Sequence, residues 1–280
     1  MTAPPAAPAA ARLALPHFAR TRSAARFVKG ALGLGLFLAA WQISVPFVGL
    51  PAFFYPPPSA VWAALVELIE KGQLLVYIFD SLYRYGLGVA AGTLVGVVAG
   101  LAVGLSPLFS RLLGPSINFF YSLVEVAWIP LLVLWFGLSM TTILVTVAIV
   151  VVWPVLFNTV AGIRSLPPVY VNAALSLGAS RAAILNDVIL PGALPSMLTG
   201  FRVSAGFGFR ALLLGELIAA KSGIGFLIFD SAANLQTART VVGMITMGLM
   251  WLFIDNMYLK PFETATVRRW GVLLTAEDHG

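Results

Sequence analysis

Long apolar runs are the feature that most constrains how this chain folds. An α-helix needs about 20 apolar residues to cross a bilayer, and in hydrocarbon its backbone groups must be bonded within the segment. Runs of about that length cover residues 28–49, 81–105, 116–137, 141–163, 194–219 and 240–259. The sequence therefore predicts an all-α, polytopic membrane protein with six transmembrane helices.

The composition supports this prediction and excludes several classes of protein. Charged residues make up 10% of the 280 residues, whereas soluble domains contain roughly 25%. There is no cysteine, and the only two histidines, His17 and His279, lie near the ends of the chain. An ordinary globular enzyme, a disulfide, a cysteine nucleophile and a histidine-bound metal are thus excluded. We expect no catalytic residue and no metal ligand.

The basic residues indicate a topology rather than a nucleic-acid site. The net charge is +6, and the positive residues collect before the first run, at Arg111, within 164–181 and after the last run. Cytoplasmic loops of membrane proteins are enriched in Lys and Arg. We therefore expect a bacterial inner (plasma) membrane protein with both termini in the cytoplasm and with no nucleic-acid partner.

The two ends of the chain are expected to be tails. Residues 1–26 are rich in Ala and Pro and then basic, which is typical of a disordered cytoplasmic tail. A cleaved signal peptide has a similar order of charges, but its apolar core is shorter than the run 28–49. We expect a transmembrane domain over 27–265 and a second cytoplasmic tail over 266–280.

Glycine recurs at every fourth position of the second run. Such a stripe exposes backbone on one helix face and allows a second helix to approach closely in lipid. The members of the stripe are Gly88, Gly92, Gly96, Gly100 and Gly104. We interpret the stripe as a packing feature, and we expect the segment that follows, 106–115, to be a turn.

The segment 164–192 is amphiphilic and differs from the apolar runs on either side. Pro168 suits a helix start, Gly178 suits a helix end, and Ser180 can cap a second helix. Pro191 is expected to stop that second helix. The pattern predicts two short helices joined by a glycine turn, although from the residues alone a plain structured loop stays equally open.

This segment resembles the cytoplasmic EAA loop of ABC importer permeases, whose pattern is Glu-Ala-Ala, three residues, Gly, nine residues, Ile-x-Leu-Pro. The chain has the same spacing in Asn172-Ala173-Ala174, Gly178 and Val188-Ile189-Leu190-Pro191. Asn172 stands in place of the glutamate and Val188 in place of the isoleucine. Other strings resemble the nitrate, sulfonate and taurine branch over about residues 40–270: PPPSAVW (56–62), AWIPLLVLWFG (127–137) and GELIAAKSGIGFLI (215–228).

The resemblance implies a type I ABC importer permease fold and a role in solute uptake. Such permeases work as dimers, here expected to be homodimers in membrane lipid. Their coupling loop, 164–192 in this chain, docks on a cytoplasmic pair of ATP-binding subunits, and a periplasmic or lipid-anchored binding protein delivers the solute. The implied coupling residues are Asn172, Ala173, Ala174, Gly178, Arg181, Leu190 and Pro191. Arg181 and Asp187 are the candidates to replace the missing glutamate.

ATP and Mg are expected on the partner ATPase and no cofactor on this chain. The string 215–222 approaches the phosphate-binding loop pattern, but Ala220 replaces its second glycine. That glycine lets backbone N–H groups surround a phosphate. No nucleotide site is therefore expected here.

Charges within the apolar runs mark the predicted translocation path. A charge at the bilayer centre costs about 2.5–3.5 kcal/mol on insertion scales, so each needs a partner or water. On an ideal helix Arg202, Arg210 and Glu216 share an arc of roughly 120°. Two roles stay open: ion pairs of Arg202 or Arg210 with Glu125 or Glu216, or a polar lining of the path. The predicted path residues are Glu125, Trp128, Arg202, Arg210 and Glu216.

The branch resemblance implies a small polar anion as solute, such as a sulfonate, nitrate or taurine, and Glu125 and Arg210 are expected to report which. Arg210 suits an anion. Glu125 does not, so a heterocyclic or cationic solute, such as a vitamin precursor, stays open. From another class, a stand-alone secondary transporter would use these charges as a proton relay, but it predicts inverted repeats, and none is evident.

Overall fold

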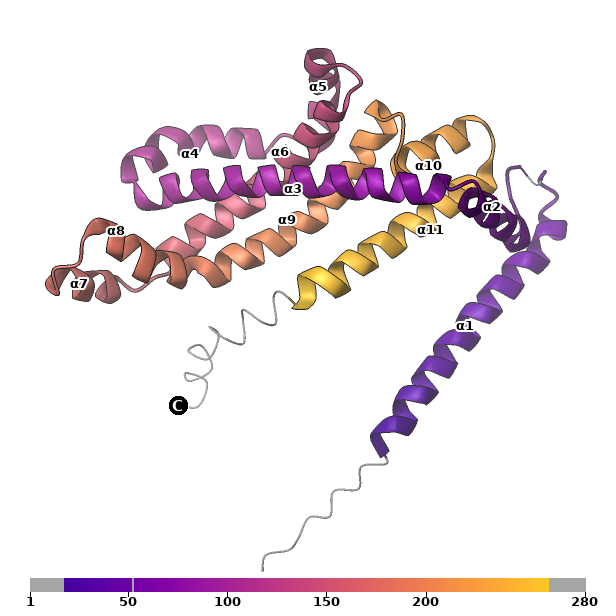
Figure 1. Ribbon diagram of the computed structural model, residues 1–280, viewed down its shortest axis with the longest axis horizontal. Coiled ribbons are helices and arrows are strands. Elements are labelled where there is room, and N and C mark those ends of the chain that lie inside the picture. The colour runs from indigo at the N-terminus through magenta and orange to yellow at the C-terminus, as the bar shows by residue number, and fades with distance from the viewer. Residues whose placement is uncertain (1–17, 52, 262–280) are drawn as a thin grey trace, which may run out of the picture. The chain divides into compact units, whose positions relative to one another are not determined.

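The structure is a computed structural model that describes residues 18–51 and 53–261. Over these residues every regular element is helical (Figure 1). The chain divides into two compact units, Met1–Ala60 and Val61–Gly280.

The N-terminal unit consists mainly of α1 (Phe18–Val48). This helix begins inside the predicted tail, and residues 1–17 of that tail lie outside the described residues. The hydroxyls of Ser44 and Tyr55 are hydrogen-bonded at 2.9 Å and tie the end of α1 to the segment that follows. The next helix, α2 (Pro58–Glu70), begins at the last of three prolines, since proline suits the first helical position.

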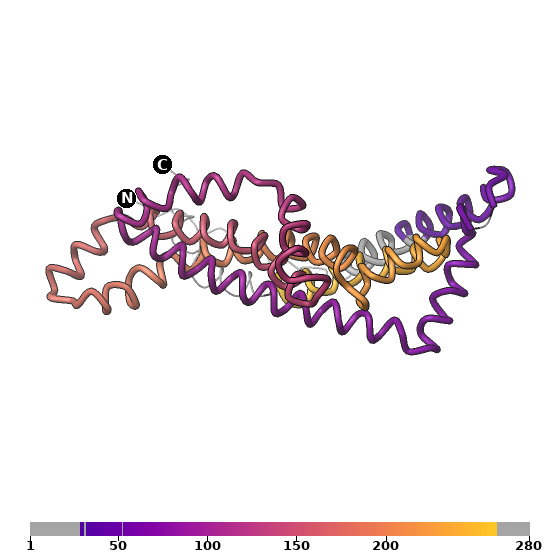
Figure 2. The backbone as a smooth tube through the Cα atoms, turned by 90° about the horizontal axis from the view of Figure 1, so that it is seen from above, coloured from indigo at the N-terminus to yellow at the C-terminus, as the bar shows by residue number. Residues whose placement is uncertain are grey.

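Three long helices form the core of the second unit: α3 (Gln73–Leu105), α6 (Met140–Arg164) and α9 (Leu190–Ala219) (Figure 1; Figure 2). The glycine stripe of α3 lies against α6. A Cβ added at Gly92 would lie 2.6 Å from the carbonyl oxygen of Ala148, and one added at Gly100 would lie 2.6 Å from Cβ of Thr159. The predicted close contact between helices is confirmed.

The third predicted span is a bent pair rather than one straight helix. α4 (Pro107–Tyr121) meets the helical segment Glu125–Phe136 at 89°, and this segment consists of the 3-10 turn η1 (Glu125–Ala127) and α5 (Trp128–Phe136). The predicted turn over 106–115 is wrong, because α4 begins at Pro107, where a proline needs no N–H partner. Pro130, which also donates no hydrogen bond, lies in the first turn of α5.

Pro191 does not stop a helix, and that prediction is wrong. α8 (Arg181–Ala183), the π-helical segment η2 (Ile184–Ile189) and α9 form one continuous helix of 39 residues. In the π-helical turn the N–H of Leu190 donates to the carbonyl of Leu185, five residues earlier. This wider turn accommodates Pro191, whose ring would clash with the carbonyl four residues earlier in a regular α-helix.

The described chain ends with α10 (Ile224–Ala233), α11 (Thr237–Ile254) and the π-helical segment η3 (Asp255–Leu259). Within the described ranges four helices are long and apolar enough to cross a membrane, or five if the bent pair is one span. The all-α, multi-pass architecture is confirmed, and the number of such helices in this part of the chain is four or five rather than six. Leu32–Val48 in α1 is a shorter apolar helix.

Candidate functional site

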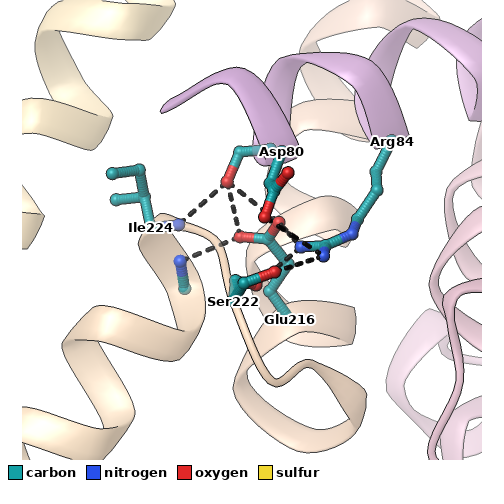
Figure 3. A network of polar contacts seen from close by, with 7 residues as sticks. Asp80, Arg84, Glu216, Ser222 and Ile224 are labelled. Atoms are coloured by element: carbon teal, nitrogen blue, oxygen red, sulfur yellow. Dashed lines mark hydrogen bonds and ion pairs between the residues drawn. The ribbon is translucent and has the colours of Figure 1, made fainter. Parts of the chain in front are cut away.

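Glu216 is a fully buried carboxylate near the end of α9. It accepts hydrogen bonds from the Ser81 hydroxyl at 2.8 Å, from Arg84 Nη1 at 2.9 Å and from the Gly225 N–H at 2.9 Å (Figure 3). Ser81 and Arg84 lie on α3, and Gly225 lies in the first turn of α10. The carboxylate therefore connects three helices.

Arg84 extends this network to the turn that precedes α10. Its guanidinium donates to the carbonyl of Ser222 at 2.6 Å and to the hydroxyl of Ser222 at 2.7 Å (Figure 3). The Ile224 N–H donates to the Ser81 hydroxyl at 2.8 Å, and Asp80 lies 3.8 Å from Arg84. The turn is thus held by hydrogen bonds from two directions.

Two glycines allow the turn to approach the carboxylate this closely. Gly223 has a φ of +110°, and a Cβ added there would overlap the Glu216 carboxylate and lie 2.7 Å from Arg84 Nη1. A Cβ added at Gly225 would lie 2.6 Å from Cβ of Glu216. Gly223 and Gly225 of the string GELIAAKSGIG therefore have a packing role around Glu216.

Of the two roles left open by the sequence, Arg202 and Glu216 show ion pairing, but with partners other than those considered there. Glu216 pairs with Arg84, and Arg202 lies 3.8 Å from Asp255 in η3, which Lys260 also approaches at 2.8 Å. The arc on α9 does not form one site, because Glu216 faces α3 and α10 whereas Arg202 faces the end of α11. Arg84 was missed as a site residue, although a charge inside the second apolar run was itself a signal.

Arg210 is exposed on α9, with its guanidinium 5.8 Å from the ring centroid of Phe207. Such a distance allows a cation–π contact. Within the described part of the chain it has no ion pair. Glu125, half-buried in η1, is close enough to interact electrostatically with Arg210 but forms no ion pair with it. The half-buried ring of Trp128 packs at 5.9 Å from that of Phe120.

A cavity of about 380 Å³ lies beside Arg210, lined by residues of α9, α10 and α11. Among the described residues that line it, Arg210 alone is charged. Most of the other lining side chains are large and apolar: Phe209, Leu213, Ile228, Met244, Met247 and Trp251. The arrangement offers one cation and an apolar surface in the same space.

At the other end of α9 lies a second candidate site, the coupling segment, defined here as residues 168–183. Its first helix, α7 (Pro168–Ser176), ends in a Schellman motif at Gly178, whose φ is +78°. The Ala179 N–H donates to the Ala174 carbonyl, and the Gly178 N–H to the Leu175 carbonyl, both at 3.0 Å. Ser180 Oγ accepts from the Ala183 N–H at 3.2 Å. The predicted helix end and cap are confirmed.

The coupling segment exposes a group of apolar side chains. Leu177 is 88% exposed, next to the glycine turn. Three more large side chains of the segment are exposed: Val169, Tyr170 and Leu175. Asn172, Ala173 and Arg181 are exposed as well, Ala174 is half-buried, and Leu190 and Pro191 beyond the segment are half-buried. Several large apolar side chains exposed in one short segment are typical of a protein–protein interface.

Chains of solved ABC transporters have a similar fold. A chain of the MetNI methionine ABC transporter, in an inward-facing conformation, matches with a TM-score of 0.55 at 16% identity, over 69% of this chain and 96% of that one. A chain of an amino acid ABC transporter with histidines also matches with a TM-score of 0.55, at 19% identity, over 72% and 97%. At such identities the likeness defines the fold alone.

The sequence then defines the family. Residues 92–258 match the family described as the binding-protein-dependent transport system inner membrane component, and the chain belongs to that family. It is 34% identical to the taurine transport system permease protein TauC of Escherichia coli K12, over 79% of this chain and 82% of that protein. It is 30% identical to the putative aliphatic sulfonates transport permease protein SsuC of Bacillus subtilis 168, over 82% and 83%.

A third relative, the bicarbonate transport system permease protein CmpB of Synechococcus elongatus, is 29% identical over 84% of this chain and 85% of that protein. The family resemblance predicted from the sequence is confirmed. The chain is a multi-pass permease subunit of an ABC importer.

Proposed function

We propose that this permease moves a small organic or inorganic anion of the sulfonate, taurine or nitrate type across the bacterial inner membrane. A binding protein outside the cytoplasm delivers the solute, and a separate pair of subunits binds ATP and Mg²⁺ and hydrolyses ATP. The names of the relatives support an anion, since they include taurine, sulfonates and bicarbonate. Arg210 beside the cavity agrees with that charge.

The proposal of an ATPase partner is supported mainly by the exposure of the coupling segment. Leu177 stands 88% exposed beside the left-handed Gly178. We assign the docking contact to Asn172, Ala173, Ala174, Gly178 and Arg181, while Leu190 and Pro191 transmit movement into α9. Because η2 joins the segment to α9 without a break, a displacement of the segment is carried directly into a transmembrane helix.

The docking assignment leads to a proposed membrane topology and a proposed oligomeric state. The coupling segment and Arg111 lie on the cytoplasmic side with both termini, in agreement with the enrichment of basic residues in cytoplasmic loops. A second, identical permease copy completes the path, for which α4 offers a surface: none of its residues is buried in this chain. Glu125, Trp128 and Arg210 line the path between the two copies, whereas Arg202 and Glu216 have mainly structural roles.

Co-purification tests the coupling assignment. The chain, tagged and extracted in mild detergent from its native cell, should bring a stoichiometric ABC ATPase with it. Leu177→Lys should remove the ATPase without loss of the permease, because it places a charge in the apolar contact. Leu235→Lys is the matched control, since Leu235 is also exposed but lies between α10 and α11. Retention of the ATPase by Leu177→Lys would refute the docking assignment.

A further inference from the structure

We propose that the cavity beside Arg210 is a transient binding site for an organic anion that has a charged head and a short apolar tail, such as an alkanesulfonate. This inference rests on the proposed function in taking the transported solute to be an anion. It goes further by selecting an anion with an apolar part over inorganic ions such as nitrate or bicarbonate.

Arg210 forms no ion pair with any of the described residues. A cation in a membrane-spanning helix is costly unless it meets a counter-charge or water. Arg84 and Arg202 have carboxylate partners within 4.0 Å, but Arg210 has none among the described residues. Its guanidinium can bind two oxygens of one anion side by side, which matches the geometry of a sulfonate or carboxylate. A passing anion is the ligand that this position lacks.

Apart from Arg210, the side chains that line the cavity are mostly apolar. The cavity volume of about 380 Å³ lies in the range of roughly 300–1,000 Å³ that is typical of small-molecule sites. The ring of Trp251 packs at 5.3 Å from that of Phe209 and forms a rigid wall. Met244 and Met247 are flexible and polarizable, so they can adapt to tails of different shape. Nitrate and bicarbonate have no apolar part to cover these walls.

A bound anion must also be able to leave this site. Glu125 interacts electrostatically with Arg210 without closing an ion pair. A carboxylate near the guanidinium weakens the attraction for an anion, so the solute can leave again. A site on a transport path needs this weakness, since tight binding would trap the solute.

Competition binding tests this inference on the full transporter complex in nanodiscs, with no binding protein present. The probe is radiolabelled 1-butanesulfonate, and the competitors are nitrate, methanesulfonate, ethanesulfonate and 1-butanesulfonate. Each methylene that the walls cover should improve competition by about fourfold. Arg210→Gln should lose binding of every competitor, and Arg210→Lys should keep part of it, which separates loss of charge from misfolding.

Gly248 offers a sharper variant for the apolar tail. It lines the cavity on α11, and an added Cβ meets no atom within 4 Å, so Gly248→Leu fits while filling cavity space. This variant should lose the dependence on tail length and bind methanesulfonate as before. Gly35→Leu is the control, because Gly35 is equally open but lies on α1. Wild-type competition that does not change with tail length would overturn the inference.

Two further measurements distinguish a bound lipid from a bound solute, and a failure of this inference from a failure of the proposed function. If phosphatidylglycerol nanodiscs abolish binding that phosphatidylcholine nanodiscs allow, the cavity holds an anionic lipid, and the inference is wrong. ATP-dependent uptake of methanesulfonate by the same complex tests the proposed function by itself. Uptake without any tail-length preference would therefore refute this inference and leave the proposed function standing.

Discussion

Arg84 Nη1 lies 2.9 Å from Glu216 Oε1, and this ion pair joins helices whose paired residues are 132 positions apart in the sequence. The Arg84 side chain is 12% exposed and that of Glu216 is fully buried. Desolvation of a buried pair is offset only where further hydrogen bonds satisfy both groups. Here Ser81 and Gly225 satisfy the carboxylate, and Ser222 satisfies the guanidinium.

The network therefore fixes the turn into α10 at one end of α9, while the coupling segment lies near the other. At about 1.5 Å per residue, the helix from Leu190 to Glu216 is roughly 40 Å long. One continuous helix thus connects a rigid polar anchor with the surface assigned to the ATPase.

Glu216→Gln should destabilise the protein strongly, because Arg84 would stay buried without a counter-charge. Loss of one partner of a buried pair costs about 3–5 kcal/mol. Thermal unfolding in mild detergent measures the effect. Glu67→Gln is the matched control, because Glu67 also pairs with an arginine, Arg239 at 2.8 Å, but at the surface. A Tm of Glu216→Gln equal to that of the wild type would contradict a structural role for the pair.

Gly223→Ala should also lower the Tm, for a steric reason. The left-handed φ of Gly223 and the overlap of an added Cβ with the Glu216 carboxylate together disfavour any side chain there. Strained backbone of this kind costs about 1–3 kcal/mol. Gly86→Ala serves as comparison, since Gly86 lies in α3 with open space around it and Ala favours a helix. Equal Tm changes for the two variants would show that the turn is not tightly packed.

The contact between α2 and α11 should weaken in strong acid. The hydrogen bond from Lys71, and then the one from Arg239, hold the pKa of the Glu67 carboxyl below its usual range. Because the folded-state pKa is depressed, the stabilisation is complete above the unfolded-state pKa of about 4.3 and is lost as pH falls through the lower, folded-state value.

The difference in Tm between the wild type and Glu67→Gln, followed from neutral to acidic pH, measures this contribution. It should be constant near neutral pH and vanish in acid. Glu70→Gln, on the same helix but without an ion pair among the described residues, should show no such difference. A Glu67 difference that grows in acid would reverse the assigned sign.

Gly178→Asp should uncouple transport without removing the protein from the membrane. Asp tolerates the left-handed conformation better than most residues, so the expected effect comes mainly from the negative charge that it adds to the exposed docking surface. The added Cβ meets no atom within 4 Å, so folding should survive. ATP-driven uptake should fall by about tenfold or more at an unchanged amount of membrane protein. Gly178→Asn, which keeps the shape without the charge, should retain more activity.

Features that depend on neighbours in the sequence were predictable. The four-residue period of Gly88 to Gly104 is visible in the sequence and predicted the close approach of another helix, which in the structure is α6. The end of α7 at Gly178 and the cap at Ser180 are local as well. The family resemblance also depended on local strings, and the match over residues 92–258 confirms it.

Features that depend on distant segments were not predictable in the same way. The arc of Arg202, Arg210 and Glu216 gave angles about one helix axis but not the helices around it, so Arg84 and Asp255 were missed as partners. The stop at Pro191 failed because the sequence does not display the π-helical turn before it. Charge and helix periodicity therefore identified important residues without identifying their contacts.

Uptake into proteoliposomes that contain the complete complex distinguishes an ATP-driven importer from a stand-alone secondary transporter. With the binding protein and a labelled alkanesulfonate outside, we expect accumulation only when ATP is supplied on the ATPase side, and its loss in Gly178→Asp. Accumulation driven by an ion gradient without ATP, and unchanged in Gly178→Asp, would refute ATP-driven import and favour the secondary transporter.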